Sequence, residues 1–325
     1  MNLIRLAGMA LWLLLSFASW AQSTVSVSGY PSRLVKIIVP YAAGGTGDLL
    51  ARLVAQELSK QTGQSFVVDN RTGAGGLIGY GAAARSVGDG YTLVAMDSSY
   101  TMFPGLYGAR VDWNIDTDLL PISMYARAAF ALAVNPARNY QQAQDLVRAA
   151  KEKPGELMYG TPGTGTLHHV FSARLLSTLD VQMTHVPYRG ASDALAAVLG
   201  NNVDWTFVAL PTITSQIHQE RLRVIAVTSD TRSALLPQVP TLRESGIAMS
   251  VSNWFGLGAP KGTSPEIVAF LNKQVKDALR SPEVAARLKS MGADPVGSSS
   301  AEFSETVRKD LATWTQVIRD AGIKQ

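Results

Sequence analysis

The stretch that decides the fold is Val39-Pro40-Tyr41-Ala42-Ala43-Gly44-Gly45-Thr46-Gly47-Asp48. Residues 34–39 before it have the β-branched density of a buried strand, and residues 50–58 after it repeat apolar side chains at helical spacing. The stretch is therefore a strand-to-helix junction. Such a junction presents backbone N–H groups and the positive end of a helix dipole, which suit a carboxylate or a phosphate. An ordinary tight turn with Asp48 at the helix start is the alternative interpretation.

Length and composition bound the class of protein. A chain of 325 residues with 46% hydrophobic and 17% charged residues is globular and long enough for two domains. The net charge of +4 is scattered along the chain, which argues against nucleic acid as a partner. The absence of cysteine from the sequence excludes disulfides and thiolate chemistry.

The N-terminus has the pattern of a secretion signal. Arg5 precedes an apolar core over residues 6–20, and Ser19-Trp20-Ala21 supplies small residues at the cleavage positions. We expect residues 1–21 to be a signal peptide cleaved near Ala21, and the mature chain to be periplasmic. An uncleaved membrane anchor is the alternative, although the apolar run is short for a membrane span.

The rest of the chain alternates strand and helix patterns, and the same alternation then starts a second time. Strand-like residues 34–39, 66–68 and 91–95 are separated by helix-like segments, which indicates a parallel sheet covered by helices on both faces. A long apolar run over residues 122–134 could be a strand that passes into a second domain. A second glycine- and threonine-rich loop over residues 160–166 then follows another short strand. We therefore predict two α/β lobes with a ligand cleft at the carboxyl ends of their strands.

Capture of an anion is the chemistry that the two loops favour. Both offer backbone N–H groups, and they add the hydroxyls of Thr46, Thr161, Thr164 and Thr166. Candidate counter-charges are Arg71, Arg127 and Arg189, for each of which a solvated or structural ion pair is the alternative. Tyr188 could close over a ligand or simply pack.

Motifs for other chemistries are missing. The sequence contains no complete G-x-G-x-x-G, Walker, G-x-S-x-G or H-E-x-x-H motif, so we expect no cofactor and no catalytic residues. His168 and His169 are adjacent and point in different directions around a helix start, which makes a weak metal site, and we expect no metal. A secreted Ser-His-Asp hydrolase stays an alternative, because such triads assemble through space.

A series of short motifs, taken in order, resembles a known family. The matching pieces are Tyr30-Pro-Ser-Arg33, Pro40-Tyr-x-x-Gly-Gly-x-x-Asp48, Val68-x-Asn-Arg-x-Gly-Ala-Gly-Gly76, Asp89-Gly-Tyr-Thr-Leu93, His169, Val186-Pro-Tyr-Arg-Gly190, Val239-Pro-Thr-Leu242 and Trp254-x-Gly-Leu257. Together they resemble the Bug (TctC-like) extracytoplasmic solute receptors of tripartite tricarboxylate transporters, over about residues 30–323.

This resemblance implies a two-lobed periplasmic binding protein fold of type II-like form. One α/β domain would comprise residues 30–124 and 251–325 and the other residues 125–250, joined by a hinge with the cleft between them. The ligand carboxylate would be held by two facing loops and bridging waters. The ligand-binding positions it implies are Tyr41, Ala42, Gly44, Gly45, Thr46, Ser98, Gly163, Thr164, Gly165, Thr166, His169 and Tyr188.

Three positions qualify the resemblance. Asp48 matches the family acid and is expected to be structural. Val208 replaces an acid that many relatives carry at a strand end facing the cleft, and His168 replaces a usually small residue beside the pocket.

The function that follows is a periplasmic receptor for a small mono- or dicarboxylate. We expect a monomer that delivers its ligand to the membrane permease subunits of a tripartite tricarboxylate transporter. The alternatives are a sensor adaptor for a signalling system and, less favoured, the secreted hydrolase.

Overall fold

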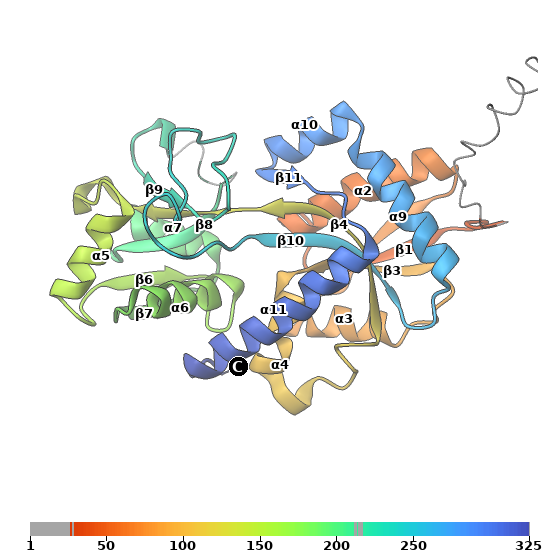
Figure 1. Ribbon diagram of the computed structural model, residues 1–325, viewed down its shortest axis with the longest axis horizontal. Helices are drawn as coiled ribbons and strands as arrows, with labels where there is room; N and C mark the ends of the chain where they lie inside the picture. Colours follow the sequence, from red (N-terminus) through yellow and green to blue (C-terminus); the bar gives the residue numbers. More distant parts are fainter. Residues whose placement is uncertain (1–26, 28, 211–212, 214–216, 325) are drawn as a thin grey trace, which may run out of the picture.

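The chain folds around two separate β-sheets, which lie side by side in Figure 1. The computed structural model describes residues 27, 29–210, 213 and 217–324. The predicted signal peptide lies outside the described residues. We call the six-stranded sheet with its helices lobe 1 and the five-stranded sheet with its helices lobe 2, and this two-lobed α/β architecture is the predicted fold class.

Lobe 1 is built from the N-terminal and the C-terminal parts of the described chain. Its sheet has the order β11-β4-β10-β3-β1-β2. The bounds of its strands are β1 (Val35–Val39), β2 (Phe66–Asn70), β3 (Thr92–Asp97), β4 (Leu119–Ala128), β10 (Asn253–Pro260) and β11 (Ala293–Pro295). Its helices are α2 (Thr46–Thr62), α3 (Leu77–Ala84), α4 (Phe103–Tyr107), α9 (Pro265–Leu279), α10 (Pro282–Ser290) and α11 (Ser300–Asp320), with 3₁₀ turns η1 (Ala74–Gly76), η2 (Ser98–Met102) and η3 (Gly108–Arg110).

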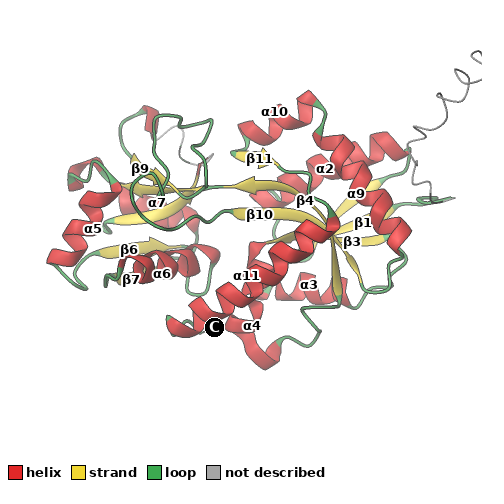
Figure 2. Cartoon of the chain, viewed as in Figure 1, coloured by secondary structure: helices red, strands yellow, loops and turns green. Residues whose placement is uncertain are grey.

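Lobe 2 is inserted between β4 and β10. Its sheet has the order β7-β6-β8-β5-β9. Its elements are β5 (Phe130–Val134), η4 (Pro136–Arg138), α5 (Ala143–Glu152), β6 (Met158–Thr161), α6 (Leu167–Leu179), β7 (Thr184–Pro187), α7 (Ala191–Leu199), β8 (Trp205–Ala209) and β9 (Arg223–Val227). The secondary structure of both lobes is coloured in Figure 2.

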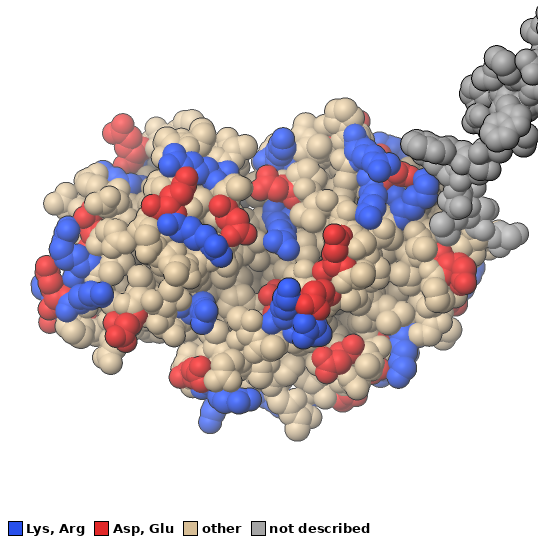
Figure 3. Space-filling model, in the orientation of Figure 1, with Lys and Arg blue, Asp and Glu red and all other residues tan. Residues whose placement is uncertain are grey.

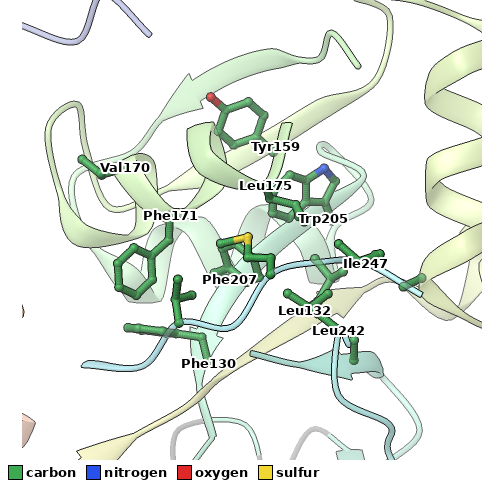
Figure 4. Packing of buried hydrophobic residues seen from close by; sticks show 14 of the residues in the cluster. Phe130, Leu132, Tyr159, Val170, Phe171, Leu175, Trp205, Phe207, Leu242 and Ile247 are labelled. Carbon is green, nitrogen blue, oxygen red and sulfur yellow. The ribbon is translucent and has the colours of Figure 1, made fainter. Parts of the chain in front are cut away.

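Aromatic and branched side chains fill the lobe 2 core (Figure 4). Trp205 is completely buried and stacks on Tyr159, with ring centroids 5.2 Å apart. Phe130 meets Phe171 edge to face at 5.7 Å, so strand β5 is locked to helix α6. Each such pair stabilises the lobe beyond the burial of its apolar surface.

The predicted parallel pairing is confirmed for part of each sheet, and both sheets also contain antiparallel pairs. The pairs β1–β2, β1–β3, β6–β7 and β6–β8 are parallel, as the alternating pattern predicted. Strand β10 is antiparallel to β3 and β4, and β5 is antiparallel to β8 and β9. Strand β10 is antiparallel to β4 because the chain leaves lobe 1 along β4, passes through the whole of lobe 2 and returns along β10 in the opposite direction.

The two crossings between the lobes run next to each other (Figure 1). Ala128 at the end of β4 is paired with Asn253 at the start of β10, and β5 of lobe 2 begins two residues later at Phe130. The apolar run over residues 122–134 therefore passes into the second lobe, as predicted, but as two consecutive strands, β4 and β5, in different sheets. The exact domain boundaries stay a prediction.

The C-terminal helix α11 contacts both lobes. Phe303 near its start is completely buried and meets Trp254 of β10 edge to face at 5.0 Å. Trp314 near its end packs against Phe171 of α6, with ring centroids 4.9 Å apart. Its start is fixed by a capping box between Ser299 and Glu302. Helix α11 is thus a packing element that spans the junction between the lobes.

The start of α2 is held by one buried carboxylate. Asp48 Oδ2 accepts hydrogen bonds from the Gly44 amide at 2.9 Å and from Arg52 Nε at 3.0 Å, and Oδ1 accepts from Asn70 Nδ2 at 2.8 Å. Burial by itself would raise the pKa of Asp48, but the hydrogen bonds from Arg52, Gly44 and Asn70 together hold it below its ordinary value. Asp48 therefore ties the first loop to strand β2.

Charge on the surface is dispersed. On the face shown in Figure 3, basic and acidic side chains are interspersed over both lobes. Among the described residues, no helix is long and apolar enough to cross a membrane.

Substitution Asp48→Asn tests the structural role of this carboxylate. We expect the free energy of unfolding at pH 7 to fall by about 1–3 kcal/mol, because a buried acceptor loses its charge-assisted bonds. Arg52 is about half exposed, so the Gly44 and Asn70 bonds should carry most of the loss.

The effect depends on pH, because the pKa of Asp48 is lower in the folded state than in the unfolded state. The ionised carboxylate therefore stabilises the fold above the unfolded-state pKa, and this contribution is lost as the pH falls through the folded-state pKa. The gap between wild type and variant should therefore shrink below about pH 3.8. Urea unfolding over a pH series measures it, with Asp112→Asn at an exposed ion pair as control. Equal stability at pH 7, or a gap unchanged in acid, would contradict the role.

Candidate functional site

A cavity of about 540 Å³ lies between the lobes, where the carboxyl ends of β1, β3 and β6 meet. Lobe 1 contributes Tyr41, Thr46, Ala74, Gly75, Asp97, Ser99, Phe103, Leu106, Tyr107, Ala128, Asn253 and Phe255. Lobe 2 and its connection contribute Ala129, Phe130, Pro162, Gly163, Thr164, Gly165, Thr166, Leu167, His168 and Ala209. The two strand-to-helix loops therefore share one cavity, which is where ligands bind in open α/β sheets.

The first loop reaches this cavity through Tyr41 and Thr46. Thr46 is the first residue of α2, and no hydrogen bond to its hydroxyl is present within the described part of the chain. The Tyr41 hydroxyl donates to Asp97 Oδ1 at 2.8 Å and also contacts the Ser99 hydroxyl. One end of the first loop is thus rigidly attached to strand β3, while the Thr46 hydroxyl is available to a ligand.

The second loop is shaped by its own internal hydrogen bonds. Thr166 caps α6, its Oγ1 accepting from the His169 amide at 3.4 Å and donating to the Gly163 carbonyl at 2.8 Å. Gly163 and Gly165 adopt φ of 142° and 69°, in the region that favours glycine. The loop is therefore held in one tight conformation around the helix start.

Several of the amides predicted to hold an anion are already hydrogen-bonded. The Gly44 amide donates to Asp48, the Gly165 amide donates to His169 Nδ1 at 3.1 Å, and the Gly163 amide donates to Thr161 Oγ1 at 3.3 Å. These groups fix the loops. Donors to a ligand must therefore come from the remaining amides and hydroxyls of the two loops.

The structure brings six of the twelve predicted ligand-binding residues to the cavity. Those that line it are Tyr41, Thr46, Gly163, Thr164, Gly165 and Thr166. Ala42, Gly44 and Gly45 belong to the same first loop and are exposed, but they are not among the residues that line the cavity. Their role in ligand binding stays a prediction.

Ser98, His169 and Tyr188 lie off the cavity wall. Ser98 is buried, and its Oγ accepts from the Trp254 amide at 2.9 Å, which ties β3 to the crossing strand. His169 stacks on His185 with ring centroids 3.8 Å apart, behind the second loop. Tyr188 packs beside the same loop, next to Gly160. In two cases the adjacent residue lines the cavity instead: Ser99 for Ser98, and His168 for His169.

The cavity wall carries no arginine or lysine side chain from the described residues. Of the candidate counter-charges, Arg71 pairs with Asp69 at 3.0 Å, and none of Arg71, Arg127 and Arg189 lines the cavity. Burial lowers the pKa of His168 to about 4, so its ring is neutral at physiological pH. The cavity therefore offers neutral donors rather than a counter-ion to a bound acid.

Residues that the sequence pattern did not single out make most of the wall. Phe103, Tyr107, Phe130 and Phe255 give it an aromatic surface, and Asp97 is its one acidic member among the described residues. Asp97 is the last residue of strand β3 and Ser99 follows it closely, so the rule that named the other two loops could have found them. The four aromatic residues come from α4 and from strands next to the crossings, where no motif marks them.

A second hollow of about 910 Å³ lies between α6 and the end of α11, lined by residues such as His169, Arg174 and Asp320. It contains neither strand-to-helix loop, so the inter-lobe cavity is the better candidate site despite its smaller volume.

Within the described part of the chain, no group of three or more His, Cys, Asp or Glu side chains could hold a metal ion.

Solved structures share this architecture over nearly the whole chain. The R. palustris protein Rpa4515, solved with adipate, is 33% identical, with a TM-score of 0.79 and coverage of 91% of this chain and 100% of its own. MatC (Rpa3494) from Rhodopseudomonas palustris, solved with bound malate, is 27% identical with a TM-score of 0.73, covering 89% and 100%.

The sequence comparisons agree. BugT of Bordetella pertussis is 33% identical over 302 residues, which are 92% of this chain and 93% of the relative. The family model described as tripartite tricarboxylate transporter family receptor, TctC, matches residues 50–323. The chain therefore belongs to the TctC family, as its motifs indicated, and is a solute-binding receptor of the periplasmic binding protein type rather than an enzyme.

Proposed function

We propose that this receptor captures a small carboxylate-bearing solute in the inter-lobe cavity and delivers it to the membrane permease of a tripartite tricarboxylate transporter. The observation that carries the proposal is that Thr46 of lobe 1 and residues 163–166 of lobe 2 line one cavity. A solute held by both lobes favours the conformation in which they are close, and that conformation is what a permease can recognise.

The relatives support the carboxylate assignment. Rpa4515 and MatC were solved with adipate and malate, both of which are carboxylates. Neutral amide and hydroxyl donors at a helix start can hold a carboxylate without a basic side chain, through charge-assisted hydrogen bonds. We further propose that residues 1–21 direct export to the periplasm and that the mature receptor is a monomer.

A panel of ligands tests recognition of the carboxylate. Mono-, di-, hydroxy- and amino-carboxylates should include members that raise the melting temperature, since a ligand at ~100 times its Kd adds about 2.7 kcal/mol of stability. Differential scanning fluorimetry measures the shift, and calorimetry then gives the affinity. Matching carboxamides are the control. If the amides shift the transition as much as the acids do, the assignment is wrong.

Substitution Thr46→Val tests the contribution of lobe 1. Valine has nearly the shape of threonine but lacks the hydroxyl, so the affinity for a carboxylate found in the panel should fall about tenfold, as for one lost hydrogen bond to a charged group. Thr178→Val, at an exposed hydroxyl far from the loops, is the matched control. An unchanged affinity in the Thr46 variant would remove lobe 1 from the proposed site.

Delivery to a permease is tested separately, by uptake. Cells lacking the permease subunits, and cells lacking this receptor, should both fail to take up the radiolabelled solute. The control is complementation with the wild-type gene. If loss of the permease leaves uptake intact while loss of the receptor abolishes a transcriptional response to the solute, the chain is a sensor adaptor instead.

A further inference from the structure

The inter-lobe cavity contains one carboxylate that the proposed function does not use. Asp97 is the last residue of β3, is only 8% exposed, and lines the cavity. It pairs with Phe255 of the crossing strand β10, so its position is fixed by the centre of the lobe 1 sheet. A buried acid placed there by the sheet is a feature of the site rather than of the surface.

The two oxygens of Asp97 have different surroundings. Oδ1 accepts from the Tyr41 hydroxyl at 2.8 Å, the Tyr80 hydroxyl at 3.2 Å, the Ser99 amide at 3.1 Å and the Ser99 hydroxyl. Oδ2 receives no hydrogen bond from any described residue. Oδ2 is also not one of the described side-chain oxygens that are sealed from solvent without a partner. The oxygen without a donor is therefore the one accessible from the cavity.

The charge of Asp97 has no counterpart in the wall. Four donors converge on Oδ1, which is the pattern of an ionised carboxylate. Burial nonetheless raises the pKa of Asp97, because the hydrogen bonds from Ser99, Tyr41 and Tyr80 offset only part of the desolvation. No lysine or arginine among the described residues lines the cavity, and His168 is neutral. A buried carboxylate with one unpaired oxygen is costly unless a cation or a strong donor meets it.

We propose that the solute carries a protonated amine as well as its carboxylate, and that Asp97 Oδ2 accepts a hydrogen bond from this amine. Asp97 is then a specificity-determining residue. The proposal rests on the proposed function for the carboxylate end, which lies at Thr46 and residues 163–166. The aromatic wall fits the same assignment, because ring faces such as those of Phe103, Phe130 and Phe255 favour a cation over an anion.

The same geometry disfavours a second carboxylate. An anion near Oδ2 would face a like charge with no basic side chain between them, which raises the free energy of the bound state. Rpa4515 and MatC were solved with dicarboxylates. The proposed preference for an amine therefore differs from the ligands with which those two structures were solved.

Pairs of ligands that differ only in the amine test the proposal. Calorimetry at pH 7 compares 4-aminobutyrate with butyrate, 6-aminohexanoate with hexanoate, alanine with propionate, and 4-(aminomethyl)benzoate with 4-methylbenzoate. The series varies the separation between amine and carboxylate. We expect at least one amine-bearing member to bind about tenfold or more tightly than its partner, as for a charge-assisted hydrogen bond.

Substitution Asp97→Asn then assigns the effect to one residue. Asparagine keeps the acceptor that its neighbours use but loses the charge, so the preference for the amine should disappear while the amine-free acid binds as well or better. Asp112→Asn, at an exposed carboxylate outside the cavity, is the matched control and should retain the preference. A melting curve establishes that each variant is folded. If the Asp97 variant does not fold, the wild-type ligand pairs still decide the proposal.

Each outcome has a defined meaning. Amine-free acids that bind wild type as tightly as their amine-bearing partners would overturn the assignment of Asp97 and leave the carboxylate receptor standing. A preference for the amine that survives in the Asp97→Asn variant would also overturn it. If neither member of any pair binds, and no compound of the wider carboxylate panel raises the melting temperature, the proposed function itself is wrong.

Discussion

The antiparallel pairing of β4 with β10 determines where the other parts of the molecule lie. These two strands are neighbours in the lobe 1 sheet, and both continue toward lobe 2, so the lobes are joined by a pair of hydrogen-bonded segments rather than by one linker. The cavity forms beside that pair, with Ala128, Phe130 and Asn253 in its wall. Any change in the angle between the lobes must bend this pair, so the cavity and the hinge are one feature of the backbone.

The loops around the cavity owe their rigidity to groups that the ligand never needs to touch. The Gly44 amide donates a hydrogen bond to Asp48, and the Gly165 amide donates one to His169. In each loop, an amide that could have bound a ligand therefore stabilises the loop conformation instead. Such preorganisation lowers the entropy lost when a ligand binds. The first loop then offers the Thr46 hydroxyl, whereas in the second loop the amide and the hydroxyl of Thr166 also bond to the Gly163 carbonyl.

Much of the fold was predictable because periodicity and caps act locally. The strand at residues 35–39, helix α6 and the serine-capped helix α9 follow directly from spacing and from residues such as Ser264. The direction of β10 was not predictable in this way, because it depends on the chain returning from lobe 2 about 120 residues after β4. The local alternation of strands and helices correctly indicated the parallel pairs, but it holds no information about a strand that pairs only after a long return.

The candidate site was also predictable only where its residues are marked by local sequence patterns. The two loops were found because strand ends and glycine runs are visible in the sequence. Ser98 and His169 were each one residue away from the side chain that lines the cavity, since one residue turns a helical backbone by about 100–120°. The aromatic wall could not be predicted, because Phe130 and Phe255 come from strands whose side of the sheet is set by the crossing.

An acid at this site has a different position from the one that the family pattern suggested. Val208 stands where many relatives carry an acid, and here it is buried in the lobe 2 core, with Ala209 beside it at the cavity. Asp97 is on lobe 1 instead. Under the proposed assignment, the carboxylate lies between Thr46 of lobe 1 and residues 163–166 of lobe 2, and the amine makes a further contact with Asp97 of lobe 1. The free energy that holds the lobes together would then depend on the distance between the two charges of the solute, because a molecule whose charges are too close together cannot occupy both places at once.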